Sequence, residues 1–188
     1  YKGQDKHHHP VTIRIATSPA VNDFLEAEHQ ALLAMHGAAD KFKDSLLPSV
    51  PRCLDSFLLT EPGKSTRRRA NVLTYLPDLV SLGDVLTAYP SGIDARDMVW
   101  MWKRILGVLY RAHSVGLIHA NCLADRLLLH LGNHGGIITD WSFAVKTGTQ
   151  ARAVVPEFLG CYPPEVREKK KVGPGTDLYM VAALMRRL

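Results

Sequence analysis

Cysteine pairs, long apolar runs and a leader-like start are the features that this sequence lacks. Its 188 residues include three cysteines, Cys53, Cys122 and Cys161, which lie far apart and form no C-x-x-C pair. This spacing argues against a disulfide framework or a zinc site and predicts a reducing, cytoplasmic location. No run of about 18 uninterrupted apolar residues is present, so we expect no membrane span. Residues 1–10 are polar and rich in histidine, unlike a signal peptide.

The composition fits a globular protein with a basic surface. Apolar residues make up 46% of the chain, the net charge is +5 and the pI is about 9.2. A positive charge of this size attracts nucleic acid or other anionic partners. The basic residues gather in only two short runs, Arg67–Arg69 and Lys169–Lys171, without aromatic residues between them. We interpret both runs as solvated loops, and nucleic-acid binding is the least favoured function.

The most informative stretch runs from Leu117 to Ser142. Its pattern indicates a short apolar strand, a polar loop, a strand at 126–131, a Gly/Asn turn at 132–136 and a second strand that ends on Asp140. A carboxylate that closes an apolar strand is costly to bury unless a cation meets it. We therefore interpret Asp140 as a ligand-binding residue.

An acid and a cation stand out in the first quarter of the chain. Val11–Ala16 alternates as a strand, with its apolar residues on one face and Arg14 on the face opposite the core. Residues 18–42 have helical periodicity, and Glu28 lies on the apolar stripe of this helix. A carboxylate on a buried stripe needs a partner. The alternative is a glutamate at the edge of an amphipathic helix.

The remaining chain alternates strands and helices. The expected elements are a cap for the first helix at Ser18 or Asn22, strands at 53–60 and 70–75, a turn at 61–69, a short helix capped at Ser81, and a helix at 94–114 that begins at Asp94 and stops at Gly116. The last of these helices has the widest apolar stripe in the sequence. It therefore is the element that we expect to form the centre of a core.

The order of these features resembles the protein kinase superfamily. Residues 119–121, His-Ala-Asn, stand where the family has a His-Arg-Asp loop, and residues 140–142, Asp-Trp-Ser, stand where it has Asp-Phe-Gly. Residues 163–165, Pro-Pro-Glu, resemble the Ala-Pro-Glu motif, and Asp177 resembles the acid that holds the catalytic loop backbone. With Asp-Trp in place of Asp-Phe, the chain is similar to a bacterial or phage branch of kinase-like sequences.

The resemblance implies a fold. It is an α+β, protein-kinase-like bilobal fold, with a β-rich N-lobe at residues 1–77 and a helical C-lobe at residues 78–188. The resemblance covers the chain from about Val11 to its end, and it implies a fragment truncated at both ends. The Gly-rich phosphate loop would then lie before Tyr1, and the last C-lobe helices would lie after Leu188.

The resemblance also implies a nucleotide site between the two lobes. The residues that it assigns to nucleotide binding are Arg14, Glu28, Thr74, Tyr75, Leu76 and Arg126. Arg14 stands at the position of the strand lysine and would pair with Glu28. Thr74 lies near the gatekeeper position, before the hinge that binds adenine. Asp140 would hold a magnesium ion, so ATP and Mg²⁺ are the expected cofactors, both bound weakly.

Two replacements predict impaired catalysis. Asn121 stands at the position of the catalytic base, and an amide cannot accept the proton of a substrate hydroxyl. Arg126 stands where the family has an asparagine on the second metal ion, and a cation gives a metal ion no ligand. We therefore expect a pseudokinase that acts through a protein partner and a nucleotide. The alternatives are an atypical active Ser/Thr protein kinase and a basic nucleic-acid-binding or structural module.

Overall fold

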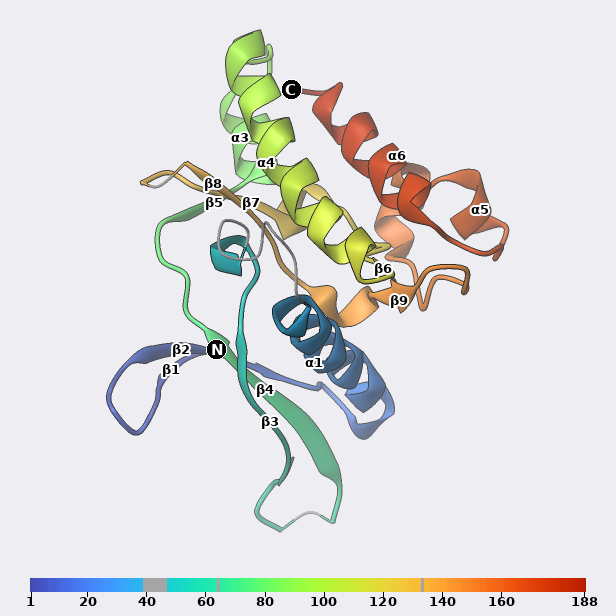
Figure 1. Cartoon of the computed structure of the whole chain (residues 1–188). Helices are drawn as coiled ribbons and strands as arrows, with labels where there is room; N and C mark the ends of the chain where they lie inside the picture. The colour runs from blue at the N-terminus through green and yellow to red at the C-terminus, as the bar shows by residue number, and fades with distance from the viewer. Residues whose placement is uncertain (39–46, 64, 133) are drawn as a thin grey trace.

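The first part of the chain folds into an antiparallel sheet (Figure 1). The computed structural model describes residues 1–38, 47–63, 65–132 and 134–188. The four strands are β1 (Lys2–Gln4), β2 (Pro10–Ile15), β3 (Cys53–Thr60) and β4 (Arg67–Thr74). Their order in the sheet is β1-β2-β4-β3, so β4 is central and pairs with both β2 and β3. The strands expected at 11–16 and 53–60 are therefore confirmed.

One helix lies between this sheet and the rest of the molecule. A short 3₁₀ turn, η1 (Pro19–Val21), leads into α1 (Asn22–Gly37). Helix α1 contacts β3 and β4 on one side and the segment around Trp141 on the other (Figure 1). Its buried residues are Leu25, Glu28, Ala31, Leu32 and Met35. The expected continuation of the helix to residue 42 falls largely on residues 39–46, which lie outside the described residues.

The predicted cap of α1 is wrong. Neither Ser18 nor Asn22 caps a helix with its side chain. Instead, Asn22 donates from Nδ2 to the backbone oxygen of Arg67 (3.0 Å) and accepts from the backbone N–H of Arg69 (2.7 Å). These two bonds fix the start of α1 to the edge of β4, because the amide supplies both a donor and an acceptor.

The expected orientation of β2 is confirmed only for Val11, which is buried. We expected the apolar residues of this strand to face the core and Arg14 to face away. Arg14 instead pairs with Glu28 of α1, whereas Ile13 and Ile15 stay only half-buried. The sheet packs α1 on its Arg14 face, because an ion pair with the helix offsets the cost of covering the cation.

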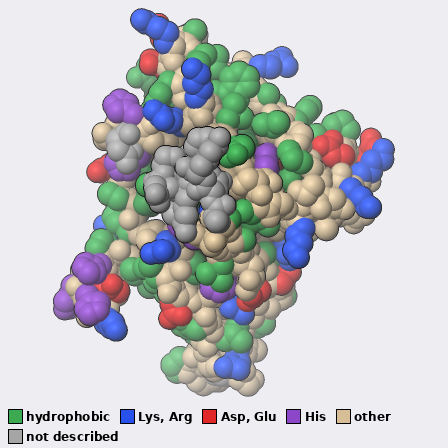
Figure 2. All heavy atoms as spheres, in the orientation of Figure 1, with side chains coloured by type: hydrophobic (Ala, Val, Ile, Leu, Met, Phe, Trp, Pro, Cys, Tyr) green, Lys and Arg blue, Asp and Glu red, His purple; other side chains and the backbone are tan. Residues whose placement is uncertain are grey.

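The first basic run belongs to a strand and not to a loop. Arg67–Arg69 opens β4, which the sequence pattern had started at Ala70. Arg68 pairs with Glu61, and Arg69 pairs with Glu26 at 2.5 Å. Since these charges are neutralised within the chain, the first run contributes little to a field that attracts anions. Figure 2 shows lysine and arginine side chains at separate places on the visible face, with no single basic patch.

The second part of the chain is mainly helical (Figure 1). After β5 (Leu79–Ser81) come α3 (Leu82–Ala88) and α4 (Ala95–Ser114). Ser81 caps α3 as expected, with a reciprocal capping box to Asp84. Asp94 accepts from the N–H of Arg96 at the start of α4, and Gly116 has a φ of 74° just beyond its end, so both boundaries of this helix are confirmed.

Short elements follow α4 and end with a further helix. They are β6 (Leu117–Ile118), η3 (Ala124–Arg126), β7 (Leu127–His130), β8 (Gly135–Ile138), η4 (Trp141–Phe143), β9 (Val145–Lys146), η5 (Pro156–Cys161), α5 (Pro164–Arg167) and α6 (Pro174–Met185). A 3₁₀ turn, η2 (Leu47–Ser49), precedes β3. Strands β5, β7 and β8 form one small sheet, and β6 pairs with β9.

The hairpin before Asp140 is shorter than expected. Arg126 lies on the 3₁₀ turn η3 and not on a strand, and β8 stops at Ile138. Asp140 has a φ of 63°, in the left-handed region, and this conformation ends the extended backbone. The carboxylate therefore projects from a tight turn next to the buried Trp141.

The core runs through α1, α4 and α6. Met35, Ile105, Leu109 and Val181 are among its fully buried side chains, and Arg111 of α4 is buried with them. Among the described residues, no helix has both the length and the apolar character that crossing a membrane requires. The lobe boundary at residue 77 stays a prediction, although β1 to β4 and α1 all precede it and α3 to α6 all follow it.

Candidate functional site

Asp140 lies between two guanidinium groups. Arg14 of β2 donates from Nη2 to Asp140 Oδ1 (2.6 Å), and Arg126 of η3 donates from Nε to Oδ2 (2.9 Å). The hydroxyl of Ser142 adds a third bond to Oδ1 (2.6 Å). Both oxygens of the carboxylate thus have charged donors, which make shorter and stronger bonds than neutral ones.

These partners set the charge of Asp140. Its side chain is 12% exposed, and burial alone would raise its pKa. Arg14, the hydroxyl of Ser142 and Arg126 outweigh burial and lower the pKa of Asp140 to about 2. The carboxylate is therefore ionised throughout the neutral range.

Arg14 joins this carboxylate to a second one on α1. Its Nη1 donates to Glu28 Oε1 at 2.5 Å, which confirms the predicted pair. Asn71 of β4 donates to the other oxygen of Glu28 (3.1 Å) and to the backbone oxygen of Leu25 (2.8 Å). Burial raises the pKa of Glu28, while Arg14 and Asn71 favour its charged form. Strands β2 and β4, α1 and the end of β8 thus meet in one polar network.

A magnesium ion at Asp140 would compete with two arginines, and its binding there stays a prediction. Mg²⁺ requires oxygen ligands at about 2.0–2.1 Å in near-octahedral geometry. Each oxygen of Asp140 already accepts from a cation, so an ion there would lie beside Arg14 or Arg126 and compete with it. Among the described residues, no three His, Cys, Asp or Glu side chains gather in an arrangement that could hold a metal.

Asn121 is sealed from solvent. The residue is completely buried, and Tyr162, which follows η5, donates from its hydroxyl to Asn121 Oδ1 (2.7 Å). The same hydroxyl accepts from the backbone N–H of Val155 (3.1 Å). Asn121 Nδ2 has no hydrogen-bond partner among the described residues. A substrate hydroxyl has no open path to this position while Tyr162 covers it.

The loop that carries Asn121 is held by Asp177. This fully buried acid at the start of α6 accepts from the backbone N–H of His119 (2.9 Å) and of Ala120 (2.8 Å). His113 of α4 lies 2.9 Å from the same carboxylate. The expected role of Asp177 in holding the loop backbone is confirmed by these bonds.

His119 supports the loop as a neutral ring. Burial lowers its pKa, in spite of the nearby charge of Asp177. Its Nε2 lies 2.9 Å from the backbone oxygen of Thr139, and its Nδ1 lies 3.2 Å from the backbone N–H of Asn121. One donor and one acceptor are what a neutral imidazole offers. The ring also packs edge-on against Trp141, so His119 positions the two segments.

A small cavity adjoins the Arg14 network. It has a volume of about 210 Å³ and combines apolar walls with a polar end formed by Arg14, Glu28 and Asp140. Its apolar and hinge-side lining includes Leu32, Leu73, Thr74, Leu76, Leu128 and Trp141. An apolar cavity with a few convergent polar groups is typical of a small-molecule site.

The three residues predicted for nucleotide binding at the hinge differ in position. Thr74 and Leu76 line the cavity, whereas Tyr75 reaches back to β1, where Lys2 lies 3.2 Å from its hydroxyl. Tyr75 is not among the residues that line the cavity. Their part in nucleotide binding stays a prediction.

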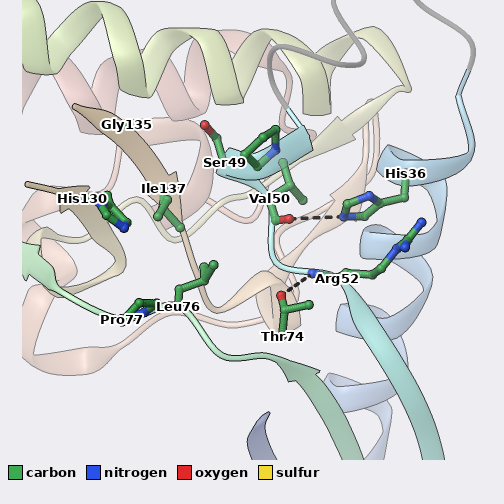
Figure 3. A pocket seen from close by; sticks show the side chains of 11 residues that line it. His36, Ser49, Val50, Arg52, Thr74, Leu76, Pro77, His130, Gly135 and Ile137 are labelled. Atoms are coloured by element: carbon green, nitrogen blue, oxygen red, sulfur yellow. Dashed lines mark hydrogen bonds between the residues drawn. The ribbon is translucent and has the colours of Figure 1, made fainter. Parts of the chain in front are cut away.

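A second hollow borders the same segment (Figure 3). It has a volume of about 530 Å³, and Thr74 and Leu76 line it together with residues that include His36, Val50 and Ile137. The hydroxyl oxygen of Thr74 accepts from the backbone N–H of Arg52. The segment after β4 therefore borders both hollows.

Sequence reasoning missed several residues of this site. Asn71 sits inside an apolar strand, and a buried amide there should have predicted partners across the sheet. Tyr162 precedes the Pro-Pro-Glu motif, but its contact with Asn121 spans 41 residues and has no local signal. Ser142 was identified only by its place in the Asp-Trp-Ser motif, which gives no sign that its hydroxyl binds Asp140.

Comparisons with known proteins rest on structure alone. No protein-family model matches the chain, and no curated protein sequence matches it. Among solved structures, 1641 chains are similar, so the fold is a common one. One of them is the kinase PK-1 of Cydia pomonella granulovirus, with a TM-score of 0.68 and 13% identity over 95% of this chain. This chain spans 59% of the length of that kinase. The fold of this chain is therefore that of the protein kinases.

Proposed function

We propose that this chain is a pseudokinase module, which keeps a cleft lined by Arg14, Glu28, Thr74 and Leu76 but does not transfer phosphate, and which acts by binding a nucleotide and a protein partner. The observation that carries the proposal is the state of Asn121. An amide replaces the proton acceptor, it is completely buried, and Tyr162 occupies its oxygen. General-base catalysis contributes about 10²- to 10⁴-fold, and no group at this position supplies it.

The surroundings of Asp140 support the same function. In-line transfer of a phosphoryl group depends on metal ions that neutralise the developing charge. The geometry of Arg14 and Arg126 around Asp140 leaves little room for such an ion. The cleft itself remains, with apolar walls and the intact pair of Arg14 and Glu28. Its bacterial or phage affiliation and cytoplasmic location stay predictions.

A label-transfer assay tests the proposal. The purified protein is incubated with γ-labelled ATP and Mg²⁺, with itself and with casein as acceptors. We expect no label above that of a heat-inactivated control, and none for Asn121→Asp, because Arg126 still occupies Asp140. Magnesium-dependent label transfer by the wild type that Asp140→Ala abolishes would instead establish an atypical Ser/Thr kinase and contradict the proposal.

The nucleic-acid alternative keeps only part of its support. Two of the three arginines in the first basic run are paired within the chain. A fluorescence-anisotropy titration with single- and double-stranded DNA at two salt concentrations measures what remains. Tight binding that falls steeply with salt would favour the basic module over the pseudokinase.

A further inference from the structure

Arg126 keeps donors that the protein does not use. It bonds to Asp140 through Nε alone, and its two Nη groups have no hydrogen-bond partner among the described residues. The side chain is 31% exposed, and it bonds to Asp140, which lines the cavity beside the Arg14 network. A guanidinium presents its N–H groups in a planar fork that matches the oxygens of a phosphate.

The charges around the cleft balance without a metal ion. The network contains two guanidiniums, Arg14 and Arg126, and two carboxylates, Glu28 and Asp140. A site that requires a divalent cation leaves uncompensated carboxylates when it is empty, and these attract the ion. Here both carboxylates already have their counter-charge, so a cation gains little by entering.

We propose that the cleft binds a nucleoside polyphosphate without a divalent cation, with the Nη groups of Arg126 on phosphate oxygens where a metal ion would otherwise lie. The base would lie against the apolar wall that includes Leu73, Leu76 and Leu128. This inference rests on the proposed function, because it names the form in which the pseudokinase takes its nucleotide. It also separates this chain from any protein that needs Mg²⁺ to bind ATP.

Binding of ATP with and without metal tests the inference directly. Isothermal titration calorimetry and thermal unfolding are run with ATP in EDTA and with ATP in excess Mg²⁺. A ligand that binds only the folded state raises the unfolding midpoint. We expect binding in EDTA, and an affinity at least threefold lower in Mg²⁺, because magnesium reduces the charge that the phosphates present to Arg126.

A variant with the family's usual residue reverses this preference. In Arg126→Asn the fork is lost and Oδ2 of Asp140 is released. We expect ATP affinity in EDTA to fall by tenfold or more, and Mg²⁺ to increase affinity instead of lowering it. Arg126→Lys keeps the charge without the fork and should show an intermediate loss. The matched control is Arg96→Asn on α4, whose side chain is 92% exposed and which should bind like the wild type. Circular dichroism verifies that each variant is folded.

Three outcomes overturn the inference. The first is wild-type binding that appears only with Mg²⁺. The second is an absence of ATP binding in both conditions, which leaves the proposed lack of phosphate transfer untouched because the label-transfer assay measures that separately. Equal loss of affinity in Arg126→Asn and Arg96→Asn would also contradict it, since the effect would then be one of net charge.

Discussion

At the scale of single residues, Arg14 bonds two carboxylates at once, which a lysine at the same position could not do with the same geometry. Its guanidinium reaches Glu28 with Nη1 and Asp140 with Nη2 at the same time. A lysine ammonium is a single point charge without the planar fork that spans two acceptors. Arg14 thus holds Glu28 and Asp140 on one rigid group. Its Nη1 and Nη2 donors are then occupied by carboxylates, whereas the lysine of a kinase donates to phosphate at this position.

The lowered pKa of Asp140 predicts how stability depends on pH. Its folded pKa of about 2 lies below the ordinary value of 3.8. The contribution is therefore complete above pH 3.8 and is lost as the pH falls through about 2. It amounts to about 2 kcal/mol of the free energy of unfolding. We expect Asp140→Asn to lower that free energy by about this amount at pH 7, measured by urea unfolding.

The same measurement repeated between pH 4 and pH 2 distinguishes the loss of the Asp140 charge interactions from a general loss of packing. The difference between wild type and Asp140→Asn should shrink as the pH falls from 4 towards 2. Asp97→Asn, at an exposed position in the first turn of α4, serves as the control and should change stability by less than about 0.5 kcal/mol. A difference that stays constant with pH contradicts the assigned charge interaction.

At the scale of elements, α1 is fixed at both ends to its neighbours. Asn22 bonds its start to the backbone of β4. At the other end, the buried Arg111 of α4 donates to the backbone oxygens of Met35 and Ala38, which the helix itself leaves unsatisfied. The position of Glu28 in the middle of the helix follows from both attachments.

Replacing Arg111 should loosen the end of α1. Arg111→Met keeps much of the apolar volume but removes the donors to Met35 and Ala38. We expect a loss of about 2–4 kcal/mol in the free energy of unfolding, because hydrogen bonds from a charged group contribute about 1.5–3 kcal/mol each. Hydrogen exchange should speed up at residues 33–38 before it does in α4.

The conservative variant provides the control. Arg111→Lys keeps a cation but not the fork that reaches two carbonyls, so we expect it to fall between the wild type and Arg111→Met. Uniformly faster exchange in α1 and α4 together would show that Arg111 acts through the core as a whole and not through the helix end.

At the scale of the whole molecule, Asp177 connects segments that are far apart in sequence. It accepts from the backbone of His119 and Ala120, and His113 lies 2.9 Å from its carboxylate. Ala120 has a φ of 57°, a conformation that costs about 1–2 kcal/mol for a residue other than glycine. The two bonds from Asp177 offset that strain and hold the loop that carries Asn121.

Removal of this acid should affect the fold far beyond α6. Asp177→Ala leaves two buried N–H groups unpaired, and we expect it to lower the free energy of unfolding by about 3 kcal/mol or more. Thermal unfolding followed by far-UV circular dichroism and by tryptophan fluorescence measures the loss, since the buried Trp141 reports on the loop. A shift of less than 1 kcal/mol would argue that the loop keeps its shape without Asp177.

The sequence predicted the elements better than their contacts. Alternation located β2 and helical periodicity located α4 within a residue or two, because these patterns depend on local spacing. The ends of α1 and β8 were misplaced. Asn22 bonds to another strand, and Asp140 turns into the left-handed region, so tertiary contacts decide both ends.

The site was predicted in part for a similar reason. The pair of Arg14 and Glu28 followed from the resemblance, and its geometry is confirmed. The hydrogen bond from Tyr162 to Asn121 joins positions 41 residues apart, and no pattern in the sequence indicates it. That Arg126 binds the carboxylate of Asp140 also depends on how two turns meet. Their roles toward a nucleotide stay predictions.

The two ion pairs of Arg14 restrict the movement of α1. Since one guanidinium bonds the acid on α1 and the acid after β8, an outward swing of α1 cannot occur while Asp140 keeps all of its partners. Displacement of α1 and release of the Asp140 carboxylate are thus coupled through the Arg14 side chain. A partner that displaces α1 would therefore also change the position of Asp140 in the cavity lining.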